Sequence, residues 1–302
     1  MSDKTEVHDD ALTTAEIKPV ATRGEADPMP APELTVLPAL AKRKGGDAVR
    51  LGQIYADRIG FTAAIEAIID QGLARRGGFV VTPNVDHVCM AETEPRLRAA
   101  YDDAFLSLID GTPLVWLARA MGTPVPAKIS GSDLILPLLE RCAQRGLRVY
   151  FLGGAPAVTA RAKEVLEGMY PGLKVVGIDS PPIGFDKDVA QNQDVLARLN
   201  AAEPHIVLVA LGCPKQEYWM HTNHKAFAPA MALGIGASLD FVAGAVKRAP
   251  HILSVLGLEW LFRLAQEPKR LFHRYLVRDR AIVGIAWRML HLPKAQRIVS
   301  RD

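Results

Sequence analysis

Asp110 is the side chain in this sequence best placed to act as a general base. It follows an apolar run, residues 106–109, and precedes Gly111. In a parallel α/β sheet the loops after the strands converge at one edge, where ligands bind, so we expect the Asp110 carboxylate in a cleft. An ionised carboxylate there could remove a proton from a substrate hydroxyl. An Asp-Gly pair is equally typical of a turn that caps the next helix, and spacing alone does not choose between the two.

Two other apolar runs end in residues of the kind that bind sugars. Thr82 and Asn84 follow residues 79–81, and both side chains donate and accept hydrogen bonds. Residues 206–211 run into Gly212, where a backbone can approach a ligand, and Gln216 follows near the start of a helix. Asn84 could instead cap its own helix, and the second segment could be an ordinary strand-to-helix turn.

Gly153 and Gly154 follow a strand and open a helix, which suits a diphosphate bound by backbone N–H groups. The sequence has neither GxGxxG nor GxxxxGK[ST], so neither a nicotinamide dehydrogenase nor a P-loop hydrolase gains support. Asp186 and Asp188 match an Asp-x-Asp pattern that can hold a divalent metal, but helix capping explains them better. We therefore predict no metal and no cofactor.

The bulk composition indicates a globular intracellular protein. The chain has 302 residues, 49% of them hydrophobic, and a formal net charge of +3. Its three cysteines are widely spaced, which disfavours both a disulfide framework and a cysteine-based zinc site. Acidic residues stand where an export signal would need a basic and then an apolar segment. No nucleic-acid-binding motif is present, so we expect no nucleic-acid partner.

Short apolar runs alternate with longer amphipathic segments, which predicts the elements that position these residues. The fold class is α/β, with a Rossmann-like, mainly parallel sheet and helices on both faces. The predicted strands are 78–81, 106–109, 148–152, 173–178, 205–211 and 230–233. The predicted helices are 85–104, 113–121, 132–145, 156–169, 188–202 and 215–225.

Three regions follow from these patterns. Residues 1–48 are rich in Ala, Pro, Glu and Thr and predict a disordered tail, and residues 49–250 form the catalytic domain. Residues 251–302 form a basic, amphipathic helical appendage with helices at 251–266 and 268–291. Arg270, Arg274 and Arg278 share one helical face there, beside apolar residues. We favour contact of this face with phosphate groups and with a membrane or the main domain, while a solvated charged face is the alternative.

A series of motifs runs in order from about residue 54 to residue 276. The motifs are Thr82-Pro83-Asn84, Asp110-Gly111, Gly131-Ser132-Asp133-Leu134, Phe151-Leu152-Gly153-Gly154, Gly212-Cys213-Pro214-Lys215-Gln216-Glu217, Gly234-Ile235-Gly236-Ala237 with Asp240-Phe241 and Gly244, Arg248-Ala249-Pro250, Gly257-Leu258-Glu259-Trp260-Leu261-Phe262-Arg263-Leu264, Glu267-Pro268-Lys269-Arg270 and Arg274-Tyr275. Taken together, this series resembles the WecG/TagA/CpsF family of bacterial glycosyltransferases.

The resemblance implies a metal-independent, inverting transfer of a sugar from a UDP-sugar to a polyprenyl-diphosphate-linked saccharide. The reaction would take place at the cytoplasmic face of the membrane, by a peripheral protein that can form homo-oligomers. Asp110 becomes the general base, and Arg263, Arg270 and Arg274 would stabilise the departing UDP. The substrate-binding residues implied are Thr82, Asn84, Gln216, Lys128, Gly153, Gly154, Gly212 and Gly236.

Lys128 is a departure from the resemblance, because the family often has an arginine near this position and a lysine loses the bidentate grip on an anion. The sugars that the family moves include N-acetylmannosamine, its uronic acid and glucuronic acid. Two other interpretations stay open from the sequence. One is a non-catalytic nucleotide-sugar-binding or membrane scaffold protein, and the other is a Rossmann-type oxidoreductase that binds a dinucleotide at Gly153-Gly154.

Overall fold

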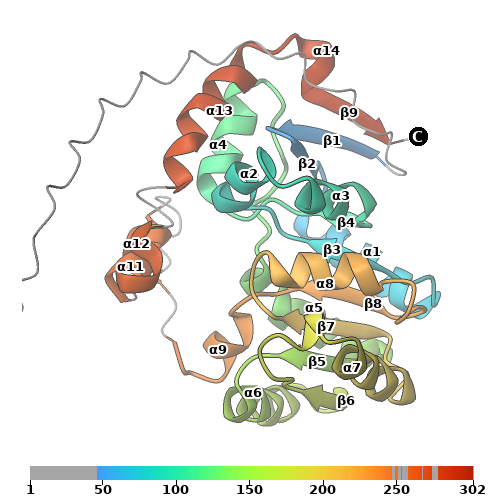
Figure 1. Ribbon diagram of the computed structural model, residues 1–302. Coiled ribbons are helices and arrows are strands. Elements are labelled where there is room, and N and C mark those ends of the chain that lie inside the picture. Colours follow the sequence, from blue (N-terminus) through green and yellow to red (C-terminus); the bar gives the residue numbers. More distant parts are fainter. Residues whose placement is uncertain are drawn as a thin grey trace, which may run out of the picture. The chain divides into compact units, whose positions relative to one another are not determined.

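Six parallel strands form the central sheet, in the order β4-β3-β8-β7-β5-β6 (Figure 1). The computed structural model describes residues 46–246, 249–250, 253, 258–266, 268–273 and 278–301. The strands are β3 (Gly78–Val81), β4 (Leu106–Ser107), β5 (Arg148–Gly153), β6 (Lys174–Asp179), β7 (Ile206–Ala210) and β8 (Met231–Gly234). Each pairs in parallel with its neighbours, so all six end at the same edge. The predicted α/β fold with a parallel sheet is confirmed.

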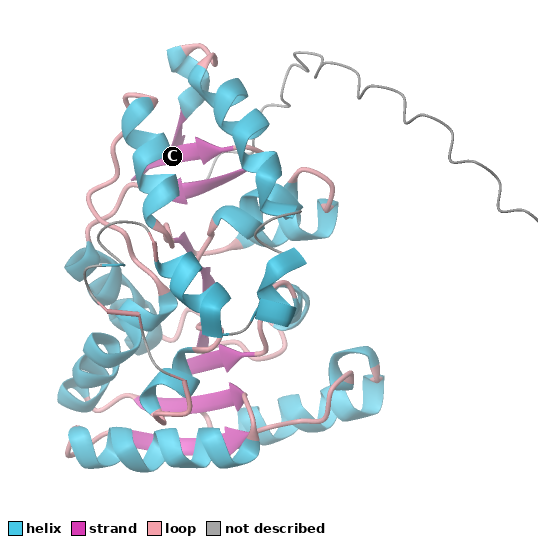
Figure 2. Ribbon diagram, turned by 90° about the vertical axis from the view of Figure 1, so that its left-hand side faces the viewer, coloured by secondary structure: helices cyan, strands magenta, loops and turns pink. Residues whose placement is uncertain are grey.

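Helices cover both faces of the sheet (Figure 2). Successive strand residues point to opposite faces, and accordingly Phe79 and Val81 belong to one apolar core and Val80 to a second. The helices on the first core are α2 (Val85–Ala91), α3 (Pro95–Asp103), α4 (Thr112–Ala120), α7 (Val189–Ala201) and α8 (Lys215–Asn223). Those on the second are α1 (Phe61–Leu73), α5 (Gly131–Arg145), α6 (Pro156–Met169) and α9 (Ser238–Val242).

The single helix predicted over residues 85–104 is wrong, because the structure divides this segment into α2 and α3. Pro95 occupies the first turn of α3, and Glu94 before it is extended, with φ −107° and ψ 91°. A proline disfavours helical backbone in the residue that precedes it, so the helix ends before Pro95 and a new one starts there.

A second, antiparallel sheet was not predicted from the sequence. Its order is β2-β1-β9, with strands β1 (Gly46–Leu51), β2 (Ile54–Asp57) and β9 (Ile298–Arg301). β1 begins within the segment 1–48 that was expected to be a tail, and β9 forms within the segment 251–302 that was expected to be helical. β9 pairs with β1 from the other end of the chain, and a strand of four residues carries little periodic signal.

Hydrogen bonds from this second sheet hold β4, the strand that precedes Asp110. The Ser107 N–H donates to the Asp57 carboxylate at 2.7 Å, and the Ser107 hydroxyl donates to the Tyr55 carbonyl at 2.7 Å. Ser107 is the last residue of β4 and is fully buried. The short edge strand β4 is therefore held by side-chain bonds to β2 as well as by its pairing with β3.

The described part of the C-terminal segment is mainly helical. Its elements are α11 (Glu259–Gln266), α12 (Pro268–His273), the 3-10 turn η3 (Asp279–Ala281), α13 (Ile282–Leu290) and α14 (Lys294–Arg297). α11 covers only the second half of the helix predicted over 251–266. The single helix predicted over 268–291 is corrected, since η3 precedes α13 as a separate turn. α13 packs on α2 and α4 and buries Ile285 and Met289 in the first core. Among the described residues, no helix has both the length and the apolar character needed to cross a bilayer.

Candidate active site

The predicted site residues of the main domain lie largely along the carboxyl edge of the six-stranded sheet. Because the strands are parallel and adjacent, the loops that follow them converge there. The edge carries Asp110 after β4, Thr82 and Asn84 after β3, Gly236 after β8, Gly212 and Gln216 after β7, and Gly153 and Gly154 at the end of β5.

Asp110 lies beside the loop that carries Thr82 and Asn84. Its backbone N–H donates to the Pro83 carbonyl at 2.8 Å, which continues the β3–β4 pairing beyond both strands. The Asp110 side chain is half-buried, and Thr82 is buried. Gly111 follows with a φ of +116° and is the N-cap residue of α4. The structure thus brings together the three residues that the sequence placed after two different strands.

Asn84 has the capping role that the sequence left open. Its Oδ1 accepts the His87 N–H at 3.2 Å, at the N-terminus of α2. The cap uses one lone pair of the amide oxygen, and an amide oxygen can accept a second hydrogen bond. Capping and substrate binding are therefore compatible at this residue.

Gln216 is buried and joins two loops of the edge. Its Oε1 accepts the Gly236 N–H at 3.1 Å, and its Nε2 donates to Glu217 Oε1 at 2.8 Å. Gly212 and Gly236 both have positive φ values, +75° and +52°, and a Cβ at either would meet no atom within 4 Å. The two glycines accordingly border open space, where a ligand could approach the backbone.

Gly153 and Gly154 line a cavity of about 500 Å³ at the ends of β5, β6 and β7. The cavity is also lined by residues 180–186 and by Lys215. Gly153 has a φ of +98°, and a Cβ there would lie 2.6 Å from the Ala210 carbonyl oxygen, so this turn requires glycine. A cavity of this size at the carboxyl edge suits a small-molecule ligand.

Lys128 forms an ion pair with Asp133 in the first turn of α5, with Nζ 3.1 Å from Oδ2. The next residue, Ile129, donates its N–H to the Ile109 carbonyl at 2.7 Å, immediately before Asp110. The Lys128 loop is thus attached to the loop of the predicted base. The Lys128 ammonium group therefore lies beside a carboxylate at the start of α5.

The side chains of the three arginines predicted to contact the leaving group lie outside the described atoms. Arg263 belongs to α11 and Arg270 to α12, but their side chains lie outside the described atoms, and Arg274 lies outside the described residues. Arg278, which sequence analysis placed on the same face, ion-pairs with Asp86 in α2 with 2.5 Å between Nη2 and Oδ1. That arginine therefore has a structural partner two residues from Asn84.

A buried polar cluster below this edge was not predicted. The Tyr101 hydroxyl lies 2.7 Å from His87 Nδ1, and ligand atoms of His87, Cys213 and Glu217 lie within 4.8 Å of one another. Burial raises the pKa of Tyr101 well above its usual range, and the nearby carboxylates of Glu217 and Asp110 add to the shift. In sequence the only signals were His87 three residues after Asn84 and Glu217 next to Gln216.

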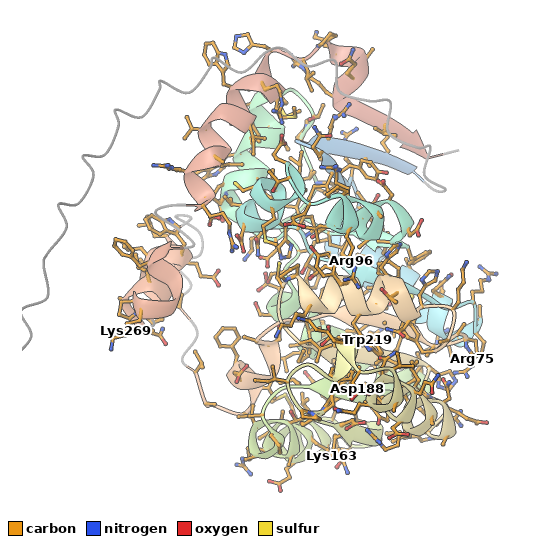
Figure 3. All side chains as sticks on the ribbon, viewed as in Figure 1. Arg75, Arg96, Lys163, Asp188, Trp219 and Lys269 are labelled. Carbon is orange, nitrogen blue, oxygen red and sulfur yellow. The ribbon has the colours of Figure 1, made fainter. Side chains whose placement is uncertain are left out.

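His, Cys and Glu side chains are ligands of zinc, so this cluster has the side-chain set to hold such an ion. Asp188, labelled in Figure 3, accepts the N–H groups of Ala190 and Gln191 and caps α7. Asp186 lies in the 3-10 turn η1 (Phe185–Lys187) and lines the cavity. The capping interpretation of Asp188 is confirmed.

Comparison with known proteins assigns most of the chain. Residues 49–296 match the glycosyl transferase WecG/TagA/CpsF family. A relative in Bacillus spizizenii, an N-acetylglucosaminyldiphosphoundecaprenol N-acetyl-beta-D-mannosaminyltransferase, is 35% identical over 195 residues, which cover 65% of this chain and 74% of the relative. The resemblance inferred from the motifs is confirmed. The protein is a glycosyltransferase, and it belongs to the WecG/TagA/CpsF family.

Proposed function

We propose that the protein transfers a sugar of the N-acetylmannosamine type from a UDP-sugar to a polyprenyl-diphosphate-linked saccharide, with inversion and without a metal ion. The relative is named for a transfer of N-acetylmannosamine to N-acetylglucosaminyldiphosphoundecaprenol, which supports this choice of sugar and acceptor. The observation that carries the proposal is the position of Asp110 beside the Thr82–Asn84 loop at the carboxyl edge. Two other donor sugars should be assayed beside N-acetylmannosamine. One is the uronic acid derived from it, and the other is glucuronic acid.

Asp110 supplies the base of a single displacement. Its carboxylate takes the proton of the acceptor hydroxyl, and the hydroxyl oxygen forms a bond to the anomeric carbon of the donor sugar. The bond from that carbon to the UDP oxygen breaks, and UDP leaves with the electron pair. Attack from the face opposite to UDP inverts the anomeric centre.

The donor nucleotide fits the cavity at Gly153 and Gly154. Its diphosphate would rest on N–H groups at the start of α6, and Lys215 supplies a positive charge at the cavity wall. From β7 to β4 the sheet spans three strand spacings, roughly 14 Å. A donor bound in the cavity therefore reaches Asp110 only when its sugar extends across the ends of β8 and β3, past Gly236 and Thr82.

Arginines replace a metal ion at the leaving group in this proposal. The C-terminal segment would bring Arg263, Arg270 and Arg274 to the UDP diphosphate, since planar guanidinium groups match phosphate oxygens with paired hydrogen bonds. These fixed cations would stabilise the negative charge that develops on the departing UDP.

In this proposal α13 contacts the membrane that carries the acceptor. Val283, Trp287 and Leu290 recur at helical spacing on one face of α13, and Val283 is 73% and Trp287 66% exposed. Residues 278–301 contain six basic residues and one acidic residue. An exposed apolar stripe in a basic segment is typical of a helix that lies in the interface of an anionic membrane. We infer a peripheral enzyme at the cytoplasmic face.

Substitution of Asp110 by Asn tests the proposed reaction. Transfer from UDP-N-acetylmannosamine to a polyprenyl-diphosphate-linked N-acetylglucosamine should fall by roughly 10²–10⁴-fold, because the amide cannot accept the proton. Binding of the donor, measured by its effect on the melting temperature, should persist. Asp103→Asn, on the exposed surface of α3, is the matched control and should keep the parental rate. Parental turnover by D110N would refute the assignment of the base.

A further inference from the structure

Glu217 is a fully buried carboxylate in the first turn of α8. A buried carboxylate is costly unless hydrogen bonds and nearby dipoles stabilise its charge, so its presence requires a reason. The helix N-terminus supplies part of the stabilisation, and the Gln216 amide donates to it at 2.8 Å. Glu217 thus lies at the start of α8, directly after the loop that follows β7, where it contacts a predicted site residue.

The carboxylate decides which way the Gln216 amide faces. The Gln216 Nε2 donates to Glu217 Oε1, so the amide nitrogen faces Glu217 and the amide oxygen faces away. The oxygen then accepts the Gly236 N–H at 3.1 Å. In the reversed orientation an oxygen would face the carboxylate and an N–H donor would face the Gly236 N–H. Both contacts would be repulsive, so the two partners select one orientation.

The loop that Gln216 supports lies at the centre of the carboxyl edge. Gly236 follows β8, which lies between β3 with Thr82 and Asn84 on one side and β7 with Gly212 on the other. Gln216 packs closely on this loop, since a Cβ at Gly234 would lie 2.8 Å from Gln216 Nε2. A donor that reaches from the cavity to Asp110 has to cross this loop, so the position of the Gly236 backbone affects how the sugar meets the base.

We propose that Glu217 is a positioning residue of the transfer reaction, which acts by orienting the Gln216 amide so that it holds the Gly236 loop in place. The inference rests on the proposed function for the reaction that it supports. Glu217 does not touch substrate in this role, and its effect passes through the Gln216 side chain to the Gly236 backbone.

Two substitutions of Glu217 separate the hydrogen bond from the space that the side chain fills. Glu217→Gln keeps an acceptor oxygen for the Gln216 amide, whereas Glu217→Met keeps the length and removes the acceptor. We expect E217Q to retain kcat/KM within about fivefold of the parent. E217M should lose about 30-fold or more, chiefly in kcat, because the sugar is then misplaced relative to Asp110. Equal activity of the two variants would overturn the proposal.

A stability control separates positioning from folding. Leu199 is buried in α7 outside this network, and Leu199→Ala lowers the melting temperature through core packing alone. Assays run well below every melting temperature should show L199A near the parental rate and E217M far below it. A loss of activity in E217M that merely matches L199A would also overturn the proposal.

Exchange of the two residues tests the direction of the hydrogen bonds. In the double variant Q216E/E217Q, the carboxylate at position 216 can accept from both the Gly236 N–H and the side-chain amide introduced at position 217. We expect this variant to recover at least tenfold in kcat/KM over Gln216→Leu, because the Gly236 loop regains its acceptor. If Q216E/E217Q is no more active than Q216L, Glu217 does not act through the Gly236 backbone.

Amide hydrogen exchange gives a readout that does not depend on the reaction. The Gly236 N–H should exchange faster in E217M than in the parent and remain protected in E217Q. If the parent transfers no sugar, the proposed function fails, and the exchange result still decides whether Glu217 holds the loop. Unchanged protection in E217M refutes the positioning role whatever the reaction is.

Discussion

At the scale of single residues, the site combines groups that the sequence signals with groups that it does not. Asp110, Thr82 and Asn84 each follow a recognisable apolar run, and backbone bonding brings them to neighbouring strand ends. His87 and Glu217 lack such a signal, and their ligand atoms meet those of Cys213 only through the packing of α2 against the loop after β7. The proposed chemistry uses Asp110 and requires no metal in this cluster.

The metal independence of the reaction gives a residue-scale prediction. Treatment of the enzyme with EDTA, followed by assay in metal-free buffer, should leave the transfer rate unchanged, because arginines rather than a cation meet the UDP charge. Elemental analysis of the purified protein should find less than stoichiometric zinc. A rate that falls with EDTA and returns with Zn²⁺ would assign a metal to His87, Cys213 and Glu217, and a return with Mg²⁺ or Mn²⁺ would point to Asp186 instead.

At the scale of elements, α2 is tied to the C-terminal segment at both ends. Asp86, in its first turn, pairs with Arg278, and Glu92, after its last turn, pairs with Arg288 at 2.5 Å. The Asp86 side chain is 3% exposed, whereas that of Arg278 is 42% exposed. Because Asn84 is the N-cap residue of α2, the ion pair with Arg278 joins the substrate edge to the segment that follows the predicted arginines.

Substitution of Arg278 by Ala should destabilise the protein through this pair. The buried Asp86 carboxylate would lose its cation, which costs about 1–3 kcal/mol once the exposure of Arg278 is taken into account. The melting temperature should fall by roughly 2–4 °C for each kcal/mol, and transfer should weaken because α2 carries Asn84. Arg280→Ala removes an exposed charge two residues away and is the matched control. A melting temperature of R278A equal to that of R280A would argue against the pair.

At the scale of the whole molecule, the two ends of the described chain form one sheet. β9 pairs with β1, and α13 contributes Ile285 and Met289 to the core beside α2 and α4. A deletion of residues 259–302 would therefore remove part of the core together with any membrane contact, and its result could not be interpreted. Point substitutions on the exposed face of α13 avoid this problem.

The membrane role of α13 is tested by Val283→Ser and Trp287→Ser. Both side chains are exposed, so their loss should leave the melting temperature within about 2 °C. Binding to vesicles that contain an anionic lipid should weaken by about tenfold or more for the double variant, since it loses apolar contact with the interface. Val189→Ser, an equally exposed valine on α7, is the matched control. If the double variant and V189S sediment with vesicles to the same extent, α13 is not the membrane-binding surface.

The sequence by itself determined the alternation of strands and helices, the residues at the strand ends and the family. These features are local, because a short apolar run, a glycine turn or an ordered series of motifs is read from neighbouring residues. Pro95 is also a local signal, because the residue before a proline resists helical backbone, and it divides the helix predicted over residues 85–104.

Only the tertiary structure decided the strand order, the β1–β9 sheet, the Arg278–Asp86 pair and the buried cluster around Glu217. Each of these joins residues far apart in the chain, and their free energy comes from burial and pairing that exist only after folding. The same holds for Gln216. The sequence predicts it as a substrate-binding residue, and only the folded protein shows that its side chain is buried and hydrogen-bonded to Glu217 and to the Gly236 N–H.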